Sequence, residues 1–177
     1  MEIKDITPAN PHYAFVESLF ISAFPESERR PVEKQRFNIE NKDIFHCYLF
    51  IENNETPIGF ITIWEFTDFY YAEHLAVDPA LRNGGYGSRV MQTLLRELEK
   101  PLILEVETPE DEMSKRRIGF YQRQGFEICD TGYVQPPYRK GGESLPMYLM
   151  VANKPQQNTL DLQTIKETIY KDVYEVC

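Results

Sequence analysis

The order of segments between residues 70 and 101 constrains the fold of this chain more than any other feature of its sequence. The run 70–77 is rich in aromatic and apolar residues and ends at Asp78-Pro79, which is typical of a β-strand. A loop with glycines at positions 84, 85 and 87 follows, and apolar residues then recur at helical spacing as far as Pro101. A strand that leads through a glycine loop into an amphipathic helix predicts a fold that mixes strands and helices.

The rest of the chain continues this alternation. Aromatic and β-branched runs predict further strands at 2–6, 45–52, 58–66, 102–106, 126–133 and 145–151. Helical spacing predicts further helices at 13–24, at 31–39 and through Ile118 to a stop at Gly125. The predicted order is β-α-α-β-β-β-α-β-α-β-β-α, an α/β (α+β) domain with a mixed, mostly antiparallel central sheet flanked by helices. The charged segment 26–36 is interpreted as a solvated helix face or a loop.

The end of the chain carries a separate signal. The polar stretch 153–158 is interpreted as a linker, and Asn158 or Thr159 is a suitable N-cap for a helix after it. One face of that predicted helix is apolar and carries Leu162, Ile165, Ile169, Val173 and Val176. We therefore expect a domain over 1–152 and an added linker and amphipathic helix over 153–177. The helix can pack on its own domain or on a second subunit, which leaves a homodimer open.

Composition excludes several classes of protein. Of 177 residues, 42% are hydrophobic, which predicts a folded domain, and a net charge of −9 makes nucleic acid an unexpected partner. No apolar run approaches the roughly 20 residues of a membrane span, and the N-terminus shows no signal-peptide pattern. Cys47, Cys129 and Cys177 are far apart and form no CxxC pair, which suits reduced thiols better than a zinc site. We expect a cytoplasmic protein with no metal and no membrane partner.

The glycine loop is the clearest candidate binding site in the sequence. A helix that begins directly after it presents unpaired backbone N–H groups and the positive end of its dipole. Glycine lets the backbone approach a phosphate closely, and Arg82 adds a permanent cation. The predicted ligand is a pyrophosphate, and the alternative is an ordinary turn. A Walker loop is excluded because Ser88-Arg89 follows Gly87, and the dinucleotide fingerprint is excluded because Val90 stands where it needs glycine.

Two motifs of the chain carry a resemblance to a known family. The first is Arg82-Asn83-Gly84-Gly85-Tyr86-Gly87 after Leu75-Ala76-Val77-Asp78-Pro79, and the second is Phe120-Tyr121-Gln122-Arg123-Gln124-Gly125-Phe126. They resemble the GNAT superfamily of N-acetyltransferases. The first matches its signature (Arg/Gln)-x-x-Gly-x-(Gly/Ala) after a segment that looks like its fourth strand, and the second resembles its signature at the end of the fourth helix. The resemblance covers residues 1 to 152. It implies an enzyme that moves an acetyl group from acetyl-CoA to a primary amine by direct attack in a ternary complex.

The resemblance also implies where acetyl-CoA, the expected co-substrate, binds. The pyrophosphate is expected on the amides of the loop, and the pantetheine arm is expected along the preceding strand like an additional β-partner. The implied cofactor-binding residues are Leu75, Ala76, Val77, Arg82, Asn83, Gly84, Gly85, Tyr86, Gly87 and Ser88. The superfamily often has an asparagine and an alanine where this chain has Ser114 and Arg117, and Arg116 or Arg117 can replace the asparagine contact.

Direct attack by an amine needs a proton acceptor and a proton donor. Glu73 is the first candidate for the acceptor, because it precedes the cofactor-binding stretch on the same strand. His74 is expected on the opposite face of a regular strand as a packed or surface residue. The resemblance directs Tyr121 at the sulfur of the departing thiol, and a phenol with a pKa near 10 stays protonated at pH 7. The presence of both Glu73 and Tyr121 favours an enzyme over the alternative, a non-catalytic CoA-binding or regulatory module.

The acceptor site is expected beside the next strand. Glu105 and Glu107 share one face of it, either as acceptor-binding residues or as a solvated strand end, and Glu105 is an alternative base. Pro136-Pro137 is rigid and is flanked by Tyr133 and Tyr138, which either wall the acceptor pocket or form a structural loop. The expected acceptor is a small-molecule amine or a peptide amine, and the sequence leaves its identity open.

Overall fold

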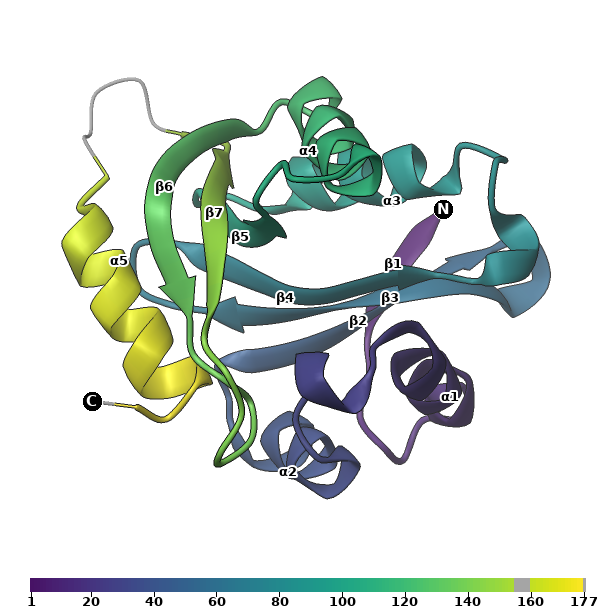
Figure 1. Ribbon diagram of the computed structural model, residues 1–177. Coiled ribbons are helices and arrows are strands. Elements are labelled where there is room, and N and C mark those ends of the chain that lie inside the picture. Colours follow the sequence, from purple (N-terminus) through teal and green to yellow (C-terminus); the bar gives the residue numbers. More distant parts are fainter. Residues whose placement is uncertain (155–159, 177) are drawn as a thin grey trace.

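A seven-stranded sheet forms the centre of the molecule in the computed structural model, which describes residues 1–154 and 160–176 (Figure 1). Its strands are β1 (Glu2–Asp5), β2 (Phe45–Glu52), β3 (Thr56–Glu65), β4 (Tyr70–Val77), β5 (Leu102–Glu107), β6 (Glu127–Gln135) and β7 (Leu145–Ala152). They lie in the order β1-β2-β3-β4-β5-β7-β6. Neighbouring strands are antiparallel, apart from the parallel pair β4 and β5. The predicted mixed, mostly antiparallel sheet is confirmed.

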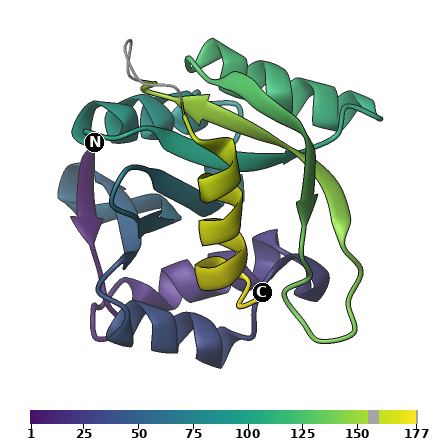
Figure 2. The same cartoon turned by 90° about the vertical axis from the view of Figure 1, so that its left-hand side faces the viewer.

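Within the described residues, five α-helices cover both faces of this sheet. They are α1 (Tyr13–Ala23), α2 (Val32–Asn41), α3 (Tyr86–Glu97), α4 (Glu112–Arg123) and α5 (Leu162–Thr168). α3 and α4 lie on one face, and α1, α2 and α5 lie on the other (Figures 1 and 2). The order of helices and strands is the predicted one.

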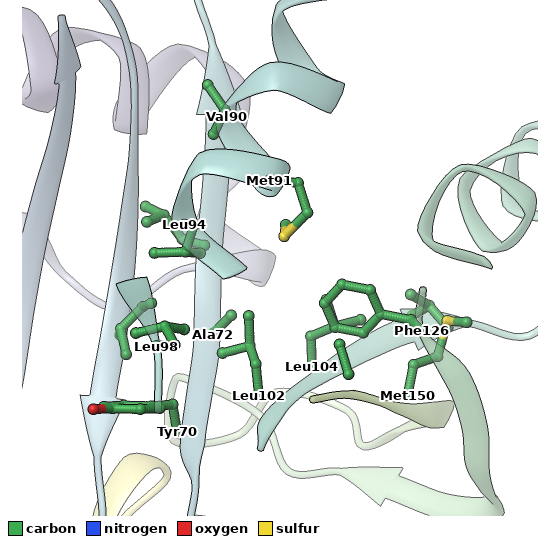
Figure 3. Packing of buried hydrophobic residues seen from close by; sticks show 14 of the residues in the cluster. Tyr70, Ala72, Val90, Met91, Leu94, Leu98, Leu102, Leu104, Phe126 and Met150 are labelled. Atoms are coloured by element: carbon green, nitrogen blue, oxygen red, sulfur yellow. The ribbon is translucent and has the colours of Figure 1, made fainter. Parts of the chain in front are cut away.

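The core beneath α3 fixes which side chains of β5 face which way. Met91 and Leu94 point from α3 toward the sheet, where they meet Leu102 and Leu104 of β5 (Figure 3). Side chains alternate along a strand, so Ile103 faces the opposite side, where it belongs to a second core that includes residues of α5. Glu105 follows the same alternation, and this places a carboxylate on the α5 side of the sheet.

The C-terminal helix begins with a side-chain cap. Asp161 accepts hydrogen bonds from the backbone N–H groups of Gln163 and Thr164, at 3.1 and 3.2 Å. The predicted caps, Asn158 and Thr159, lie outside the described residues. The cap therefore falls two residues later than the nearer of them.

This helix packs on its own domain, which is one of the two predicted alternatives. α5 continues into a π-helical turn over Ile169–Val173. Ile165, Ile169 and Val173 are buried in the second core against residues of the sheet. The predicted apolar face therefore covers the side of the sheet that carries Glu105.

Two further expectations concern membrane-spanning helices and the state of the cysteines. No helix in the described ranges is both long and apolar enough to cross a bilayer. Cys47 is buried and Cys129 is half-buried, both as free thiols, and Cys177 lies outside the described residues.

Candidate active site

The parallel pair β4 and β5 opens into a cleft near the middle of the sheet. The pairing of these two fully described strands runs from Tyr70 and Leu102 to Ala72 and Leu104 and ends there. Glu73 and Glu105 come next, at the point where the strands diverge. Two cavities meet at these glutamates, and both are lined by them.

The two cavities differ in what else lines them. Phe24, Glu28 and Arg117 line both cavities together with the two glutamates. We call the first the loop cavity, and its own lining includes Leu75, Ala76, Val77, Arg82 and Tyr121. We call the second the acidic cavity, and its own lining includes His74, Glu107, Gln135, Tyr138 and Met147. Residues from the predicted cofactor site thus lie on one side of the glutamates, and residues from the predicted acceptor site lie on the other.

A bulge in β4 turns two consecutive side chains to the same side of the sheet. Ile63 of β3 pairs with Ala72, and Thr62 pairs with His74, so Glu73 is an additional residue between the two pairs. Glu73 and His74 both line the acidic cavity. The expectation that they face opposite sides is therefore wrong, because it assumed a regular strand.

His74 is a packed residue, as expected. Its side chain is almost completely buried, and its ring lies edge-on to those of Phe20 and Phe24, with centroid distances of 5.0 and 4.7 Å. Nε2 donates a hydrogen bond to the Glu28 carbonyl at 3.0 Å. Burial lowers the pKa of His74, which favours the neutral imidazole.

Glu73 is held in a buried ion pair. Its carboxylate accepts hydrogen bonds from the Arg30 guanidinium and, at 2.8 Å, from Trp64 Nε1. The side chains of Arg30 and Glu73 are 4% and 0% exposed. The guanidinium also lies 5.3–5.7 Å from the ring centres of Phe45, Trp64 and Tyr138. A proton taken up by Glu73 would leave a buried guanidinium without its counter-charge, which is costly.

Glu105 is half-buried and lies among uncharged donors. Tyr133 Oη donates to Oε1 at 2.5 Å, Tyr174 Oη donates to Oε2 at 2.9 Å, and the Gln135 amide also donates to Oε2. Burial raises the pKa of Glu105, and these hydrogen bonds act in the opposite direction. Because no partner in this set is cationic, Glu105 can take up a proton without leaving an unpaired charge. Its contacts suit a proton acceptor better than those of Glu73.

Carboxylates set the charge of the acidic cavity. Four glutamates line it: Glu28, Glu73, Glu105 and Glu107. Arg117 also lines it, but its guanidinium already donates to Glu107 Oε2 at 2.5 Å. Of the other predicted acceptor residues, Tyr138 lines the cavity and Tyr133 lies behind Glu105 at 1% exposure. A concave surface of this kind attracts a cation.

The loop before α3 has the backbone geometry of an anion site. Asn83 and Gly85 have φ angles of 65° and 72°, in the left-handed region. Gly85 is the N-cap and Tyr86 is the first helical residue, so the N–H groups of the first turn lack partners inside the helix. Gly87 and Ser88 belong to this turn, and the Gln124 amide donates to Ser88 Oγ at 3.0 Å. That contact fixes the loop against α4.

Tyr121 lies on α4 and lines the loop cavity. Its ring packs edge-on against Phe120 and Phe126, with centroid distances of 5.2 and 5.4 Å. Burial raises the pKa of Tyr121, so its hydroxyl keeps its proton at neutral pH. Gly125, at a φ of 92°, ends the helix as predicted.

Ser114 and Arg117 have structural partners on α4. The hydroxyl and the backbone N–H of Ser114 both donate to the Asp111 carboxylate, at 2.8 and 2.7 Å, and this closes the N-terminal cap of the helix. Arg117 pairs with Glu107 as described. Both departures from the superfamily pattern therefore serve α4 and its neighbouring strand.

Several residues of this site were not found from the sequence, among them Arg30, Trp64 and Tyr174. Arg30 belongs to the charged segment 26–36, and its interpretation as solvated is wrong because Arg30 is 4% exposed. Trp64 was assigned only to a strand. Tyr174 comes directly after Val173 in the sequence and does not fall on the predicted apolar face. Helical spacing therefore did not mark it as buried, although it is only 7% exposed. Only tertiary contacts bring these side chains to the two glutamates.

Known proteins match both the sequence and the fold. Residues 13–126 match the model of the acetyltransferase (GNAT) family. A Bacteroides thetaiotaomicron protein described as a GNAT-family acetyltransferase is 43% identical over 100% of both chains, with a TM-score of 0.94. A search of curated proteins gives no match.

More distant structures share the fold. A spermidine N-acetyltransferase from Vibrio cholerae, in complex with CoA and spermine, is 12% identical over 85% of this chain and 93% of that chain, with a TM-score of 0.62. An aminoglycoside 6'-N-acetyltransferase complexed with coenzyme A is 16% identical over 89% of this chain and 100% of that chain, with a TM-score of 0.61. At these identities the likeness shows the fold alone.

Proposed function

Because the chain belongs to the GNAT family of acetyltransferases, we propose that it moves an acetyl group from acetyl-CoA to a primary amine of a cationic acceptor by direct attack in a ternary complex. The observation that carries this proposal is the meeting of two cavities at Glu73 and Glu105. One cavity reaches Arg82 of the proposed anion-binding loop, and the other adds Glu107 to the glutamates that the two cavities share. An acyl donor and an amine can therefore approach the same point from opposite sides.

Acetyl-CoA is the proposed co-substrate, and it supplies the reaction with an acetyl thioester. The loop fits its pyrophosphate, because the amides of 83–88 start a helix and Arg82 adds a cation. The edge of β4 at 75–77 fits the pantetheine arm, because the pairing of β4 with β5 has already ended at Ala72. Family members complexed with CoA support this choice of donor.

Glu105 is our preferred acceptor of the proton that the substrate ammonium loses to become the attacking amine, with Glu73 as the competing candidate. The uncharged donors around Glu105 allow it to become protonated, whereas Glu73 is needed as the counter-ion of Arg30. Burial raises the pKa of Glu105, which makes it a stronger base than an exposed carboxylate. Glu73 then keeps the bulged end of β4 in place through its bonds to Arg30 and Trp64.

Tyr121 is the proposed proton donor to the departing sulfur. It lines the loop cavity together with Glu105, so it stands on the co-substrate side of the cleft. Its buried hydroxyl carries a proton at neutral pH, which is the form that a general acid requires. Donation from a neutral phenol needs no prior charging of the side chain.

A cationic amine is the proposed acceptor class, either a small molecule or the amine of a peptide. Of the four glutamates of the acidic cavity, Glu107 is paired with Arg117 and Glu73 with Arg30, so Glu28 and Glu105 supply its excess of carboxylates. An acceptor with a second positive charge would retain that charge in the cavity after the first amine has lost its proton. Two enzymes of similar fold are named for spermidine and aminoglycosides, which are amines of this kind.

An acceptor screen tests the proposal directly. Thiol release from acetyl-CoA is followed with diamines and polyamines, amino sugars, amino acids and peptides. We expect turnover with amines that carry a second positive charge, and a raised KM for the acceptor in Glu107→Gln. Glu112→Gln is the matched control, because Glu112 is exposed and lies outside the lining of the acidic cavity. Binding of CoA without thiol release from any amine would instead favour a non-catalytic CoA-binding module.

A further inference from the structure

The C-terminal segment, which lies outside the family-matched residues 13–126, reaches the carboxylate at the centre of the cleft. Tyr174 Oη donates to Glu105 Oε2 at 2.9 Å, across 69 positions of sequence. We infer that Tyr174 is a positioning residue that holds Glu105 in its ionised form and orientation, so that the C-terminal helix is part of the acceptor site. This inference rests on the proposed function through the role given to Glu105.

A π-helical turn aims Tyr174 at the sheet. In a regular α-helix, Tyr174 would point about 140° away from Ile169 around the axis, because successive residues are about 100° apart. Here the Tyr174 N–H donates to the Ile169 carbonyl at 3.3 Å, five residues back, and this wider turn brings Tyr174 round toward the side of the helix that carries Ile169. Val173 and Tyr174 are consequently both buried, at 5% and 7% exposure. A regular helix could cover the core with Val173 alone. The widened turn is what additionally brings Tyr174 to the sheet.

The tyrosine hydroxyls around Glu105 form a directed chain. Tyr174 has one hydroxyl proton and gives it to the carboxylate, so its oxygen is left to accept. Tyr71 Oη lies 3.3 Å from that oxygen and can donate to it. Tyr138 Oη lies 3.5 Å away on the side of the acidic cavity. Tyr174 therefore connects Glu105 both to β4 and to the wall of the cavity.

Loss of this one hydrogen bond changes the proton affinity of Glu105 in a predictable direction. A hydrogen bond donated to a carboxylate stabilises the ionised form, so its removal raises the pKa of Glu105 further. Several titratable and charged groups line the two cavities with Glu105 or lie in its hydrogen-bond network. They are Glu28, Tyr71, Glu73, His74, Arg82, Glu107, Arg117, Tyr121, Tyr133, Tyr138 and Tyr174. The substitution Tyr174→Phe leaves every other group in place and keeps the ring in the core.

The test compares Tyr174→Phe with Tyr170→Phe. Tyr170 lies on the same turn, but its hydroxyl donates to the Val134 carbonyl at 2.5 Å and not to Glu105. The first measurement is the titration of the Glu105 carboxyl carbon by 13C NMR, with Glu105→Gln used to assign the signal. We expect the midpoint to rise by about one pH unit in Tyr174→Phe and to stay in place in Tyr170→Phe. Tyr71→Phe should raise it less, because the hydroxyl of Tyr71 stabilises the Glu105 carboxylate less than that of Tyr174 does.

The second measurement is the pH profile of kcat/KM. Its acid limb should move upward with the carboxyl midpoint, which lowers the rate about tenfold on that limb and leaves the plateau nearly unchanged. An unchanged carboxyl midpoint in a folded Tyr174→Phe protein would overturn the inference, whatever the activity. A carboxyl midpoint that moves without the kinetic limb would support the role of Tyr174 and overturn the proposal that Glu105 is the base.

Discussion

Replacement of Glu73 by glutamine should mainly destabilise the fold, because it breaks a buried ion pair on one side only. Arg30 would keep its charge at 4% exposure and lose its counter-ion. Removal of one partner of such a pair typically costs 3–5 kcal/mol. We expect the lower end, about 3 kcal/mol, because a glutamine oxygen still accepts one hydrogen bond and three aromatic rings lie within 5.7 Å of the guanidinium. For a chain of this length that corresponds to a fall in Tm of about 8 °C.

Urea unfolding of Glu73→Gln, Arg30→Met and the double variant measures this directly. The double variant should be more stable than Glu73→Gln, because it no longer buries an uncompensated charge. Below its unfolding transition, Glu73→Gln should keep kcat within about tenfold of the wild type, since a lost catalytic base costs about 10²–10⁴. A Glu73→Gln protein of normal stability but with a 1000-fold lower kcat would refute this reasoning and make Glu73 the base.

Three further predictions concern the donor, the loop and the histidines. Tyr121→Phe should lower kcat about 10- to 1000-fold with unchanged CoA affinity by calorimetry, and a wild-type rate would make Tyr121 a packing residue. Gly87→Val should fold, since its Cβ would lie 3.6 Å from the Phe120 ring, and should weaken CoA binding at least about tenfold by filling the phosphate approach; wild-type affinity would contradict the loop assignment. The hydrogen bond that His46 donates to the Asp5 carboxylate raises the pKa of His46, and burial lowers that of His74. Imidazole NMR should therefore show His46 titrating above about 6.5 and His74 below it, and the reverse order would contradict the packing described.

These two histidines also act on stability in opposite senses. His46 has a raised pKa in the folded state, so its contribution is present below about pH 6.5 and is lost as pH rises through the folded pKa. The pKa of His74 is lowered, so its contribution is present above about pH 6.5 and is lost as pH falls. Urea unfolding of His74→Phe should consequently show a weaker loss of stability on acidification than the wild type.

The fold could be predicted because its signals are local. Strand and helix periodicity, Gly125 at a helix end and the glycine loop before α3 each depend on neighbouring residues. The predicted order of elements is confirmed for that reason. The C-terminal helix was also visible in the pattern, but whether it packed on its own domain depended on contacts with residues about 60 to 100 positions away.

The details of the site could not be predicted because they are set by contacts distant in sequence. The bulge at Glu73 depends on the register of β4 against β3, and a sequence pattern carries no register information. Arg30 stands among other charged residues in the sequence. It is buried because it pairs with Glu73, which lies 43 residues further along the chain and cannot be identified as its partner from local pattern. Tyr174 is turned inward by a widened helical turn, and regular helical spacing does not anticipate it.

The pH dependence of kcat/KM in Glu105→Gln, at saturating acetyl-CoA, tests the central claim most directly. The wild type should show an acid limb that belongs to Glu105, well below the pKa of about 10 at which an aliphatic amine loses its own proton. Glu105→Gln should lower the plateau by about 10²–10⁴ and abolish that limb, with CoA affinity unchanged. A variant that kept both the limb and the wild-type rate would contradict the account, and the base would then lie elsewhere in the cleft.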